Sequence, residues 1–290
     1  MTERWTAAAT AWMLRPPASD DHKYSRGVVG IRTGSAAYPG AAVLGVDAAW
    51  RTGVGMVRYL GPARAADLVL ARRPETVTAE GRVQAWVVGS GTDPAARDAA
   101  ETAALRGILA GAEPVIVDAG ALGLARDAAA PVIVTPHARE HDALRSAIGL
   151  APVSPDAGED ERAAACAESA ARLGAVVLLK GAVTIVADPA GGIRRVEAGT
   201  AWLATAGTGD VLAGAIGAVV AALIARDGAA GLPVLADAAA AAAWLHGRAG
   251  TLAAGALGPA GGPITALEVA EALPRAVAEV LARGSAQPPS

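Results

Sequence analysis

The chain has 290 residues, 53% of them hydrophobic, so it is long enough to bury a large core in one α/β domain or in two small ones. Its formal net charge is −3 and it has no basic run, which argues against nucleic acid as the main partner. Residues 1–10 carry charges with no apolar core behind them, and no apolar run free of glycine and charge reaches membrane-spanning length, so we expect a cytoplasmic protein with no membrane partner.

The N-terminal part predicts one βαβ unit behind a lead-in. Residues 1–20 are expected to be helical or irregular and to end in a turn after Pro16 and Pro17. A buried strand is predicted at 28–32, a helix at 41–52 and a second strand at 55–60, with a loop of small residues between the first strand and the helix. Strand, glycine-bearing loop, helix and strand form the repeating unit of an α/β fold.

The same alternation continues to the C-terminus. Further strands are predicted at 83–88, 114–117, 131–134, 175–179, 183–187 and 192–196, and helices at 94–110, 138–148, 159–173, 234–253 and 265–282, with one more beginning near Asp210. Residues 284–290 are expected to be a disordered tail. No change in composition divides the chain, so 1–290 is interpreted as a single α/β domain with a mostly parallel sheet and helices on both faces.

Small, polar or glycine residues directly follow five of these strands, at 34–35, 89–92, 118, 135–137 and 180–181. Each position alone is explained as a turn, but five at the carboxyl edge of one sheet predict a shared ligand crevice. Glu140, one helical turn after His137, could join it as an indirect metal or phosphate contact. His141 and His246 are interpreted as structural, and without a cluster of ligands at metal-binding spacing no tightly held structural metal is expected.

A glycine-rich turn leads straight into an apolar helix at Gly207, Thr208, Gly209 and Asp210. The free N–H groups of such a helix start form an anion hole suited to phosphate. A carboxylate at its mouth predicts a function: accepting a proton from a hydroxyl that attacks phosphorus, or holding a metal ion. The alternative is that Asp210 is only the helix N-cap, and the motif by itself does not decide between the two.

Two residue types are scarce. Only Lys23 and Lys180 are lysines among 25 basic residues, so each is expected where a compact ammonium is needed and a planar guanidinium will not serve. The single cysteine, Cys166, lies in an alanine-rich segment and is predicted to be a buried, inert thiol in a reducing compartment.

Seven motifs in this order resemble the ADP-dependent (S)-NAD(P)H-hydrate dehydratases: HK…G at 22–27, GSxxYPGAAxLxxxAAxRTGxG at 34–55, VVGSGT at 87–92, VDAGAL at 117–122, TPHxxE at 135–140, LKGAxT at 179–184 and ATAGTGDVLAG at 204–214. The resemblance covers about residues 20–255 and departs from the family pattern at 24–26 and 199–203. It implies a ribokinase-like three-layer α/β/α sandwich. It also implies repair of hydrated nicotinamide cofactors, by phosphorylation of the ring hydroxyl of the S-epimer and elimination of phosphate.

The resemblance also implies site residues. The hydrated dinucleotide would contact Ala41, Gly91, His137 and Asp210, with Asp210 as the catalytic base, and ADP or ATP with Mg²⁺ would be held by Lys180, Gly181, Ala182, Val183, Thr184 and Gly209. A separate NAD(P)H-hydrate epimerase is a possible partner.

Two other functions are considered. A ribokinase-like kinase of a hydroxymethylpyrimidine or hydroxyethylthiazole would share Gly207–Asp210 but would need only a small pocket. A noncatalytic nucleotide sensor would explain the altered 199–203 segment, although the intact Asp210 argues against it. Apolar positions on more than one face of the helices at 234–253 and 265–282 further predict a homo-oligomer.

Overall fold

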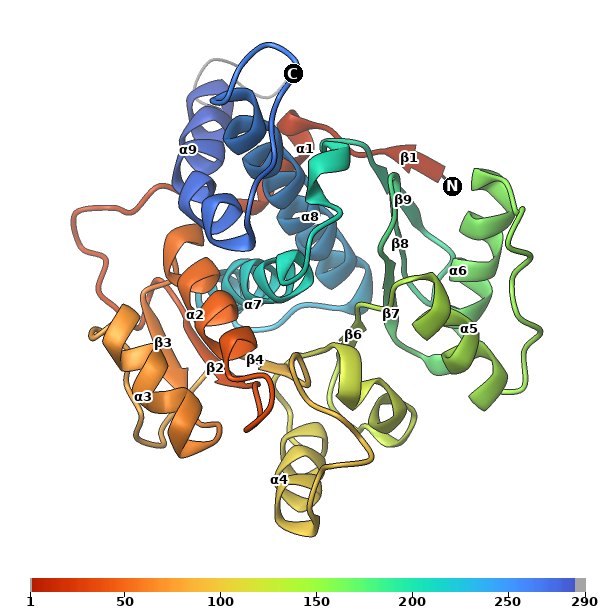
Figure 1. The fold of residues 1–290 in the computed structure, drawn as a ribbon, viewed down its shortest axis with the longest axis horizontal. Coiled ribbons are helices and arrows are strands. Elements are labelled where there is room, and N and C mark those ends of the chain that lie inside the picture. The colour runs from red at the N-terminus through yellow and green to blue at the C-terminus, as the bar shows by residue number, and fades with distance from the viewer. Residues whose placement is uncertain (1, 285–290) are drawn as a thin grey trace.

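The computed structural model describes residues 2–284, and these residues build one nine-stranded sheet (Figure 1). Its strand order is β1-β9-β8-β7-β6-β5-β4-β2-β3. The strands are β1 (Thr2–Arg4), β2 (Val28–Arg32), β3 (Met56–Tyr59), β4 (Ala85–Val88), β5 (Val115–Val117), β6 (Val132–Val134), β7 (Val176–Leu179), β8 (Thr184–Ala187) and β9 (Ile193–Val196). Only β8 of these strands pairs antiparallel with its neighbours, so the predicted mostly parallel sheet is confirmed.

Helices cover both faces of this sheet, as expected for a three-layer sandwich. The helices are α1 (Ala7–Met13), α2 (Gly40–Thr52), α3 (Ala63–Arg72), α4 (Ala99–Leu109), α5 (Ala138–Ala147), α6 (Glu159–Leu173), α7 (Thr208–Asp227), α8 (Leu232–Gly255) and α9 (Ala266–Gly284), with 3-10 turns η1 (Ala119–Asp127) and η2 (Ala201–Leu203). One core lies between the sheet and α2, α7 and α8, and a second lies between the sheet and α4, η1, α5 and α6. Helices α1 and α9 pack on the outside of α8.

The strands alternate their side chains between the two cores. In β7, Val176 and Leu178 enter the core of α7 and α8, whereas Val177 and Leu179 enter that of α5 and α6. Because both faces of the sheet are covered, the central strands β4, β5, β6 and β7 are apolar at every position, whereas the outer strands β3 and β9 carry arginine. This continuous hydrophobicity is what predicted the central strands correctly.

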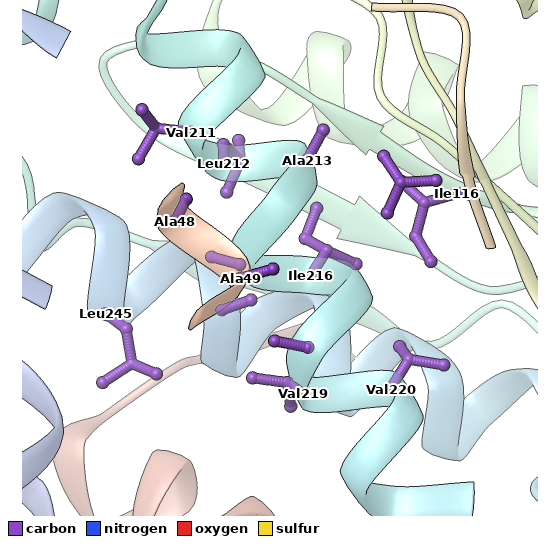
Figure 2. Close-up of a cluster of buried hydrophobic side chains, with 14 of the residues drawn as sticks. Ala48, Ala49, Ile116, Val211, Leu212, Ala213, Ile216, Val219, Val220 and Leu245 are labelled. Atoms are coloured by element: carbon purple, nitrogen blue, oxygen red, sulfur yellow. The ribbon is translucent and has the colours of Figure 1, made fainter. Parts of the chain in front are cut away.

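Helix α7 is the central helix of one face (Figure 2). Figure 2 shows Val211, Leu212, Ile216 and Val219 of α7 among Ala48 and Ala49 of α2 and Leu245 of α8. The helix is long and apolar enough to cross a membrane by composition, but 72% of that apolar window is buried inside the protein. Its hydropathy therefore reflects its central position.

Several elements differ from the sequence predictions. The lead-in contains the helix α1 and also the unpredicted edge strand β1, which pairs parallel with β9. Helix α3 was not predicted, because only Ala65 and Val69 of its ten residues are buried and its apolar stripe is narrow. Helix α4 begins at residue 99, not 94, since the Asp98 side chain caps it by accepting from the Glu101 N–H.

Two predictions about the chain ends extend beyond the described residues. Of the predicted tail at 284–290, Gly284 ends α9 and the others are not described; Met1 of the lead-in is likewise not described.

Cys166 lies where expected: it is fully buried, and burial raises the pKa of its thiol to about 12, so the prediction of an inert thiol is confirmed.

Candidate active site

Asp118 joins the ends of four neighbouring strands. It directly follows β5 and is buried. Its Oδ2 accepts a hydrogen bond from Ser90 Oγ after β4 at 2.9 Å, and its Oδ1 accepts from Thr135 Oγ1 after β6 at 2.8 Å and from Lys180 Nζ after β7 at 2.9 Å. The predicted gathering of polar residues at one sheet edge is thus observed, with a carboxylate at its centre.

The Lys180 ammonium is the cation that contacts Asp118 at this edge of the sheet. Its backbone N–H donates to Pro136 O at 2.9 Å, and its Nζ lies 3.9 Å from Glu140 Oε2 in addition to its contact with Asp118. A Cβ built on Gly209 would stand 3.6 Å from Nζ, so the ammonium lies beside the start of α7. The structure therefore brings together Lys180 and Gly209, two of the predicted nucleotide-binding residues.

The glycine turn before α7 forms the expected helix start. Gly207 is the N-cap residue with φ +89°, a left-handed conformation that favours glycine, and a Cβ there would come within 2.6 Å of Leu44 Cδ1. The Thr208 hydroxyl donates to Leu203 O and Thr205 O, which ties the turn to η2. The first N–H groups of α7 have no acceptor inside the helix and are available to an anion.

Asp210 is not the N-cap. It lies in the first turn of α7, after Gly207 has already capped the helix without any side-chain hydrogen bond, so the capping alternative is wrong. Burial is the main cause that raises the pKa of its carboxyl to about 6; the nearby charge of Asp118 raises it further and Lys180 lowers it. A carboxyl with this pKa is suited to exchange protons near neutral pH.

A cavity of about 630 Å³ opens beside this helix start. The predicted residues in its wall are Lys180, Gly181, Ala182, Thr184, Thr208 and Gly209, while Val183 is absent from the wall. The rest of the wall comes largely from the 196–204 segment and from α8. Such a volume is that of a small-molecule site rather than of a solvent gap.

Ala41 and Gly91 lie against each other at the start of α2. A Cβ on Gly91 would overlap the Ala41 Cβ, and Gly91 also has φ +66°, so glycine is required there. One turn further along α2, a Cβ on Gly45 would stand 3.5 Å from Asp210 O, so this helix leads from the Ala41–Gly91 contact to the start of α7.

His137 and Glu140 form a capping box at the start of α5. His137 Nδ1 accepts from the Glu140 N–H at 3.2 Å, and Glu140 Oε2 accepts from the His137 N–H at 2.8 Å. The predicted indirect metal contact of Glu140 stays a prediction: within residues 2–284 no three His, Cys, Asp or Glu side chains are grouped to hold a metal ion.

Two site features were missed by sequence reasoning. Asp118 was placed at the crevice but given no role, because its three partners come from separate loops. His246, interpreted as structural, is buried yet lies in the cavity wall, and burial lowers the pKa of its ring to about 4. His141 is structural as predicted, with Nε2 2.9 Å from Ser169 Oγ.

The HK…G motif lies at the other end of the sheet. Residues 22–27 precede β2, and His22 Nδ1 accepts from the N–H groups of Tyr24 and Ser25. Lys23 lies over the Tyr24 ring at 5.3 Å. Of the two lysines in the chain, only Lys180 is therefore at the crevice.

The mostly parallel α/β/α sandwich with its glycine-capped central helix is a ribokinase-like fold. A ribokinase-like superfamily protein from Enterococcus faecalis shares it with a TM-score of 0.76 at 21% identity, covering 96% of each chain. The family model described as NAD(P)H-hydrate dehydratase matches residues 29–275. The chain belongs to the NAD(P)H-hydrate dehydratase family.

Three relatives show how far the similarity extends. The bifunctional NAD(P)H-hydrate repair enzyme of Mycobacterium leprae is 44% identical over 90% of this chain and 53% of its own length. The ADP-dependent (S)-NAD(P)H-hydrate dehydratase of Neisseria meningitidis is 37% identical over 84% of this chain and 83% of its own. The ADP/ATP-dependent NAD(P)H-hydrate dehydratase of Bacillus subtilis, co-crystallised with ATP/Mg²⁺, has a TM-score of 0.77 at 27% identity, covering 96% and 98%. The chain thus spans about half the length of the bifunctional relative.

Proposed function

We propose that this protein dehydrates the S-epimer of hydrated NADH or NADPH back to the dihydronicotinamide cofactor, using ADP or ATP. The observation that carries the proposal is the Asp210 carboxyl, whose pKa is raised to about 6, at the free N-terminus of α7 beside Lys180 and the 630 Å³ cavity. The names of the Neisseria and Bacillus relatives agree with it.

The reaction first converts a poor leaving group into a good one. Asp210 accepts the proton of the ring hydroxyl while the hydroxyl oxygen forms a bond to the terminal phosphorus and the bond from phosphorus to the nucleotide breaks. With ADP the nucleotide leaves as AMP. The N–H groups of Thr208 and Gly209 and the Lys180 ammonium stabilise the transferring phosphoryl group.

Phosphate then leaves from the ring. The lone pair of the ring nitrogen supplies the electrons as the carbon–oxygen bond breaks, and loss of a proton from the neighbouring carbon restores the ring double bond. We assign binding of the hydrated dinucleotide to Ala41, Gly91, His137 and Asp210, and that of the adenine nucleotide to Lys180–Thr184 and Gly209. The cavity wall supports the nucleotide assignments apart from Val183. The dinucleotide residues do not line that cavity, and their assignment is supported by the Ala41–Gly91 contact at the start of α2.

Mg²⁺ fits this edge as an ion held mainly by the nucleotide. The available carboxylates are those of Asp210 and Glu140, because Asp118 is committed to three hydrogen bonds, and Mg²⁺ usually needs only one or two carboxylates beside phosphate oxygens. When bound it would neutralise charge on the phosphate chain.

We further propose that 1–290 acts as one catalytic unit in the cytoplasm, with a separate epimerase as partner and as a homo-oligomer. The bifunctional name of the Mycobacterium relative, which is about twice as long, supports a link to a second repair activity. The buried free thiol of Cys166 fits a reducing compartment. The apolar faces of α8 lend less support to an oligomer, because α1, α7 and α9 cover them within the chain.

The function is tested by incubating the protein with hydrated NADPH, ADP and Mg²⁺ and measuring all products. We expect NADPH, AMP and inorganic phosphate in equal amounts. Transfer of phosphate to a hydroxymethylpyrimidine or hydroxyethylthiazole, with no NADPH recovered, would establish the kinase alternative. Nucleotide binding without any turnover would establish the sensor.

A further inference from the structure

One buried nitrogen in the wall of the 630 Å³ cavity has no partner. Within residues 2–284, three buried side-chain nitrogen or oxygen atoms lack a hydrogen-bond partner, and they belong to Thr33, Arg195 and His246. Of these three residues, only His246 lines the cavity, and the unpaired atom is its Nε2. The residue is 9% exposed. Withdrawing a ring nitrogen from water without a partner is costly, so the position indicates a ligand.

Helix α8 holds the His246 ring in this wall. The helix packs against α7 and against β7, β8 and β9 (Figure 1). A Cβ on Gly247, the next residue, would come within 2.8 Å of Gly199 N, and Thr251 Oγ1 donates to Ala198 O at 3.0 Å. The backbone of α8 is thus in close contact with the segment after β9, which forms part of the same wall. The position of the ring is therefore fixed by the packing of its helix.

Two polar residues act on the ring but leave Nε2 unpaired. Burial lowers the pKa of the ring to about 4, while a hydrogen bond with the Thr208 backbone raises it and the Lys180 charge lowers it. The Lys180 ammonium is paired with Asp118 at 2.9 Å, and the Thr208 hydroxyl donates to Leu203 O at 3.0 Å. At neutral pH the ring is therefore uncharged, with one N–H group and one lone pair.

The cavity has a polar end and a more apolar remainder. Lys180 and Gly209 form the polar end, which suits phosphate. Apolar side chains of the remaining wall include Val196, Leu203, Leu212 and Ala243. They suit a flat base. The hydrogen bond with Thr208, the residue before Gly209, places His246 next to the polar end. Because ribose lies between the phosphate and the base of a nucleotide, ribose is the group expected at His246.

We propose that His246 is a nucleotide-binding residue whose Nε2 forms a hydrogen bond with a ribose hydroxyl of the adenine nucleotide. A hydroxyl both donates and accepts, so it can pair with Nε2 whichever ring nitrogen carries the proton, whereas an ionised phosphate oxygen can only accept. The proposal rests on the nucleotide site of the proposed function and names a residue that recognises the sugar there.

Calorimetric binding of ADP and of 2′,3′-dideoxy-ADP, without any hydrated cofactor, tests the proposal. The wild type should bind ADP at least about tenfold more tightly, because only ADP carries the ribose hydroxyls. His246→Phe keeps a flat ring without nitrogen, so its ADP affinity should fall and the difference between the two nucleotides should disappear. His246→Gln, whose amide can still bond to a hydroxyl, should retain part of that difference.

Melting temperatures separate this role from a structural one. His246→Phe removes an unpaired buried nitrogen, so the free variant should melt at the wild-type temperature or above it. The matched control is His141→Phe, because the Nε2 of this buried histidine lies 2.9 Å from Ser169 Oγ and the residue does not line the 630 Å³ cavity. This control should melt lower than the wild type and should keep the wild-type preference for ADP.

Three results would overturn the proposal. Equal binding of the two nucleotides by the wild type would show that no ribose hydroxyl is recognised. An undiminished preference for ADP in His246→Phe would show that another group recognises it. A lowered melting temperature in both His246 variants, with an equal loss of affinity for both nucleotides, would show that the ring only supports the cavity wall.

The proposed function can fail separately. Failure of the wild type to bind ADP would remove the nucleotide site itself. A protein that prefers ADP through His246 but does not dehydrate hydrated NADPH would contradict the proposed function alone.

Discussion

Asp118 acts in opposite ways on Asp210 and Lys180, which lie at the same edge of the sheet: its charge disfavours the ionised form of Asp210 and attracts the Lys180 ammonium. Asp210 is raised in pKa by burial and by the charge of Asp118, which keeps it ready to take up a proton. Lys180 is held as a fixed cation by its 2.9 Å contact with the same Asp118. One buried carboxylate therefore contacts the cation and raises the pKa of the proposed base, and the proposed roles of Lys180 and Asp210 can be tested separately.

The pKa of Asp210 predicts the pH dependence of turnover. A general base works only when deprotonated, so the rate should be constant above about pH 7 and fall as pH drops through about 6, approaching tenfold per pH unit. The measurement is the turnover number against pH at saturating substrates. A profile flat down to about pH 5 would show that another group is the base.

Replacement of Lys180 by arginine should weaken nucleotide use. The ammonium lies between Asp118 and the start of α7 at Gly209, where a larger guanidinium would crowd the helix start. We expect the Michaelis constant for the nucleotide to rise about tenfold. Lys23→Arg, at the exposed opposite end of the sheet, is the control and should change nothing. An unchanged constant in Lys180→Arg would contradict the assignment.

At the level of residues, sequence motifs predicted those parts of the site that are local in the chain. Gly207–Asp210 and Lys180 stand directly at a helix start and a strand end, where the backbone alone determines their position. The central position of Asp118 could not be recognised, because it depends on partners from three other loops.

At the level of elements, the position of Asp210 depends on how closely α7 approaches α2. A Cβ on Gly214 would overlap Gly45 O, so the two helix backbones are in contact at this crossing. Apolar strands and long helices were predicted well because their burial requires many apolar residues, which are visible in the sequence. Helix α3, with two buried residues, and the edge strand β1, with three residues, carry too little of that signal.

Gly214→Ala should destabilise the protein by about 1–3 kcal/mol, because the added methyl forces α7 away from α2. Denaturant unfolding measures this change. Gly107→Ala is a matched control in the exposed interior of α4, with nothing within 4 Å of its Cβ, and should stabilise by about 0.5–1 kcal/mol through helix propensity. Equal stability of Gly214→Ala and the wild type would show that the two helices are not in backbone contact.

For the whole molecule, buried histidines predict sensitivity to acid. Burial lowers the pKa of His141 and of His246 from 6.5 to about 4, so their contribution to stability is present above pH 6.5 and is lost as pH falls towards 4. Asp210 acts in the opposite sense, since its raised pKa adds stability as pH falls below about 6. The two histidines outweigh the one carboxyl, and the net effect should be destabilising.

Unfolding free energies at pH 7.5 and pH 5 check this prediction. The wild type should lose stability between them, and His141→Gln, which can still bond to Ser169, should reduce the loss by on the order of 2 kcal/mol. The same loss in the variant would mean that His141 does not stay neutral in the folded protein.

The central claim is that Asp210 is the base of a phosphoryl-transfer dehydration, and one comparison tests it most directly. Turnover of hydrated NADPH with ADP is measured for the wild type and Asp210→Asn, alongside melting temperature and ADP affinity in the same preparations. Asparagine keeps the shape of the side chain but cannot accept the proton. The account predicts a rate lower by roughly 10²-fold or more, with stability and ADP affinity equal to or above those of the wild type. A stable Asp210→Asn variant that turns over at the wild-type rate would contradict it.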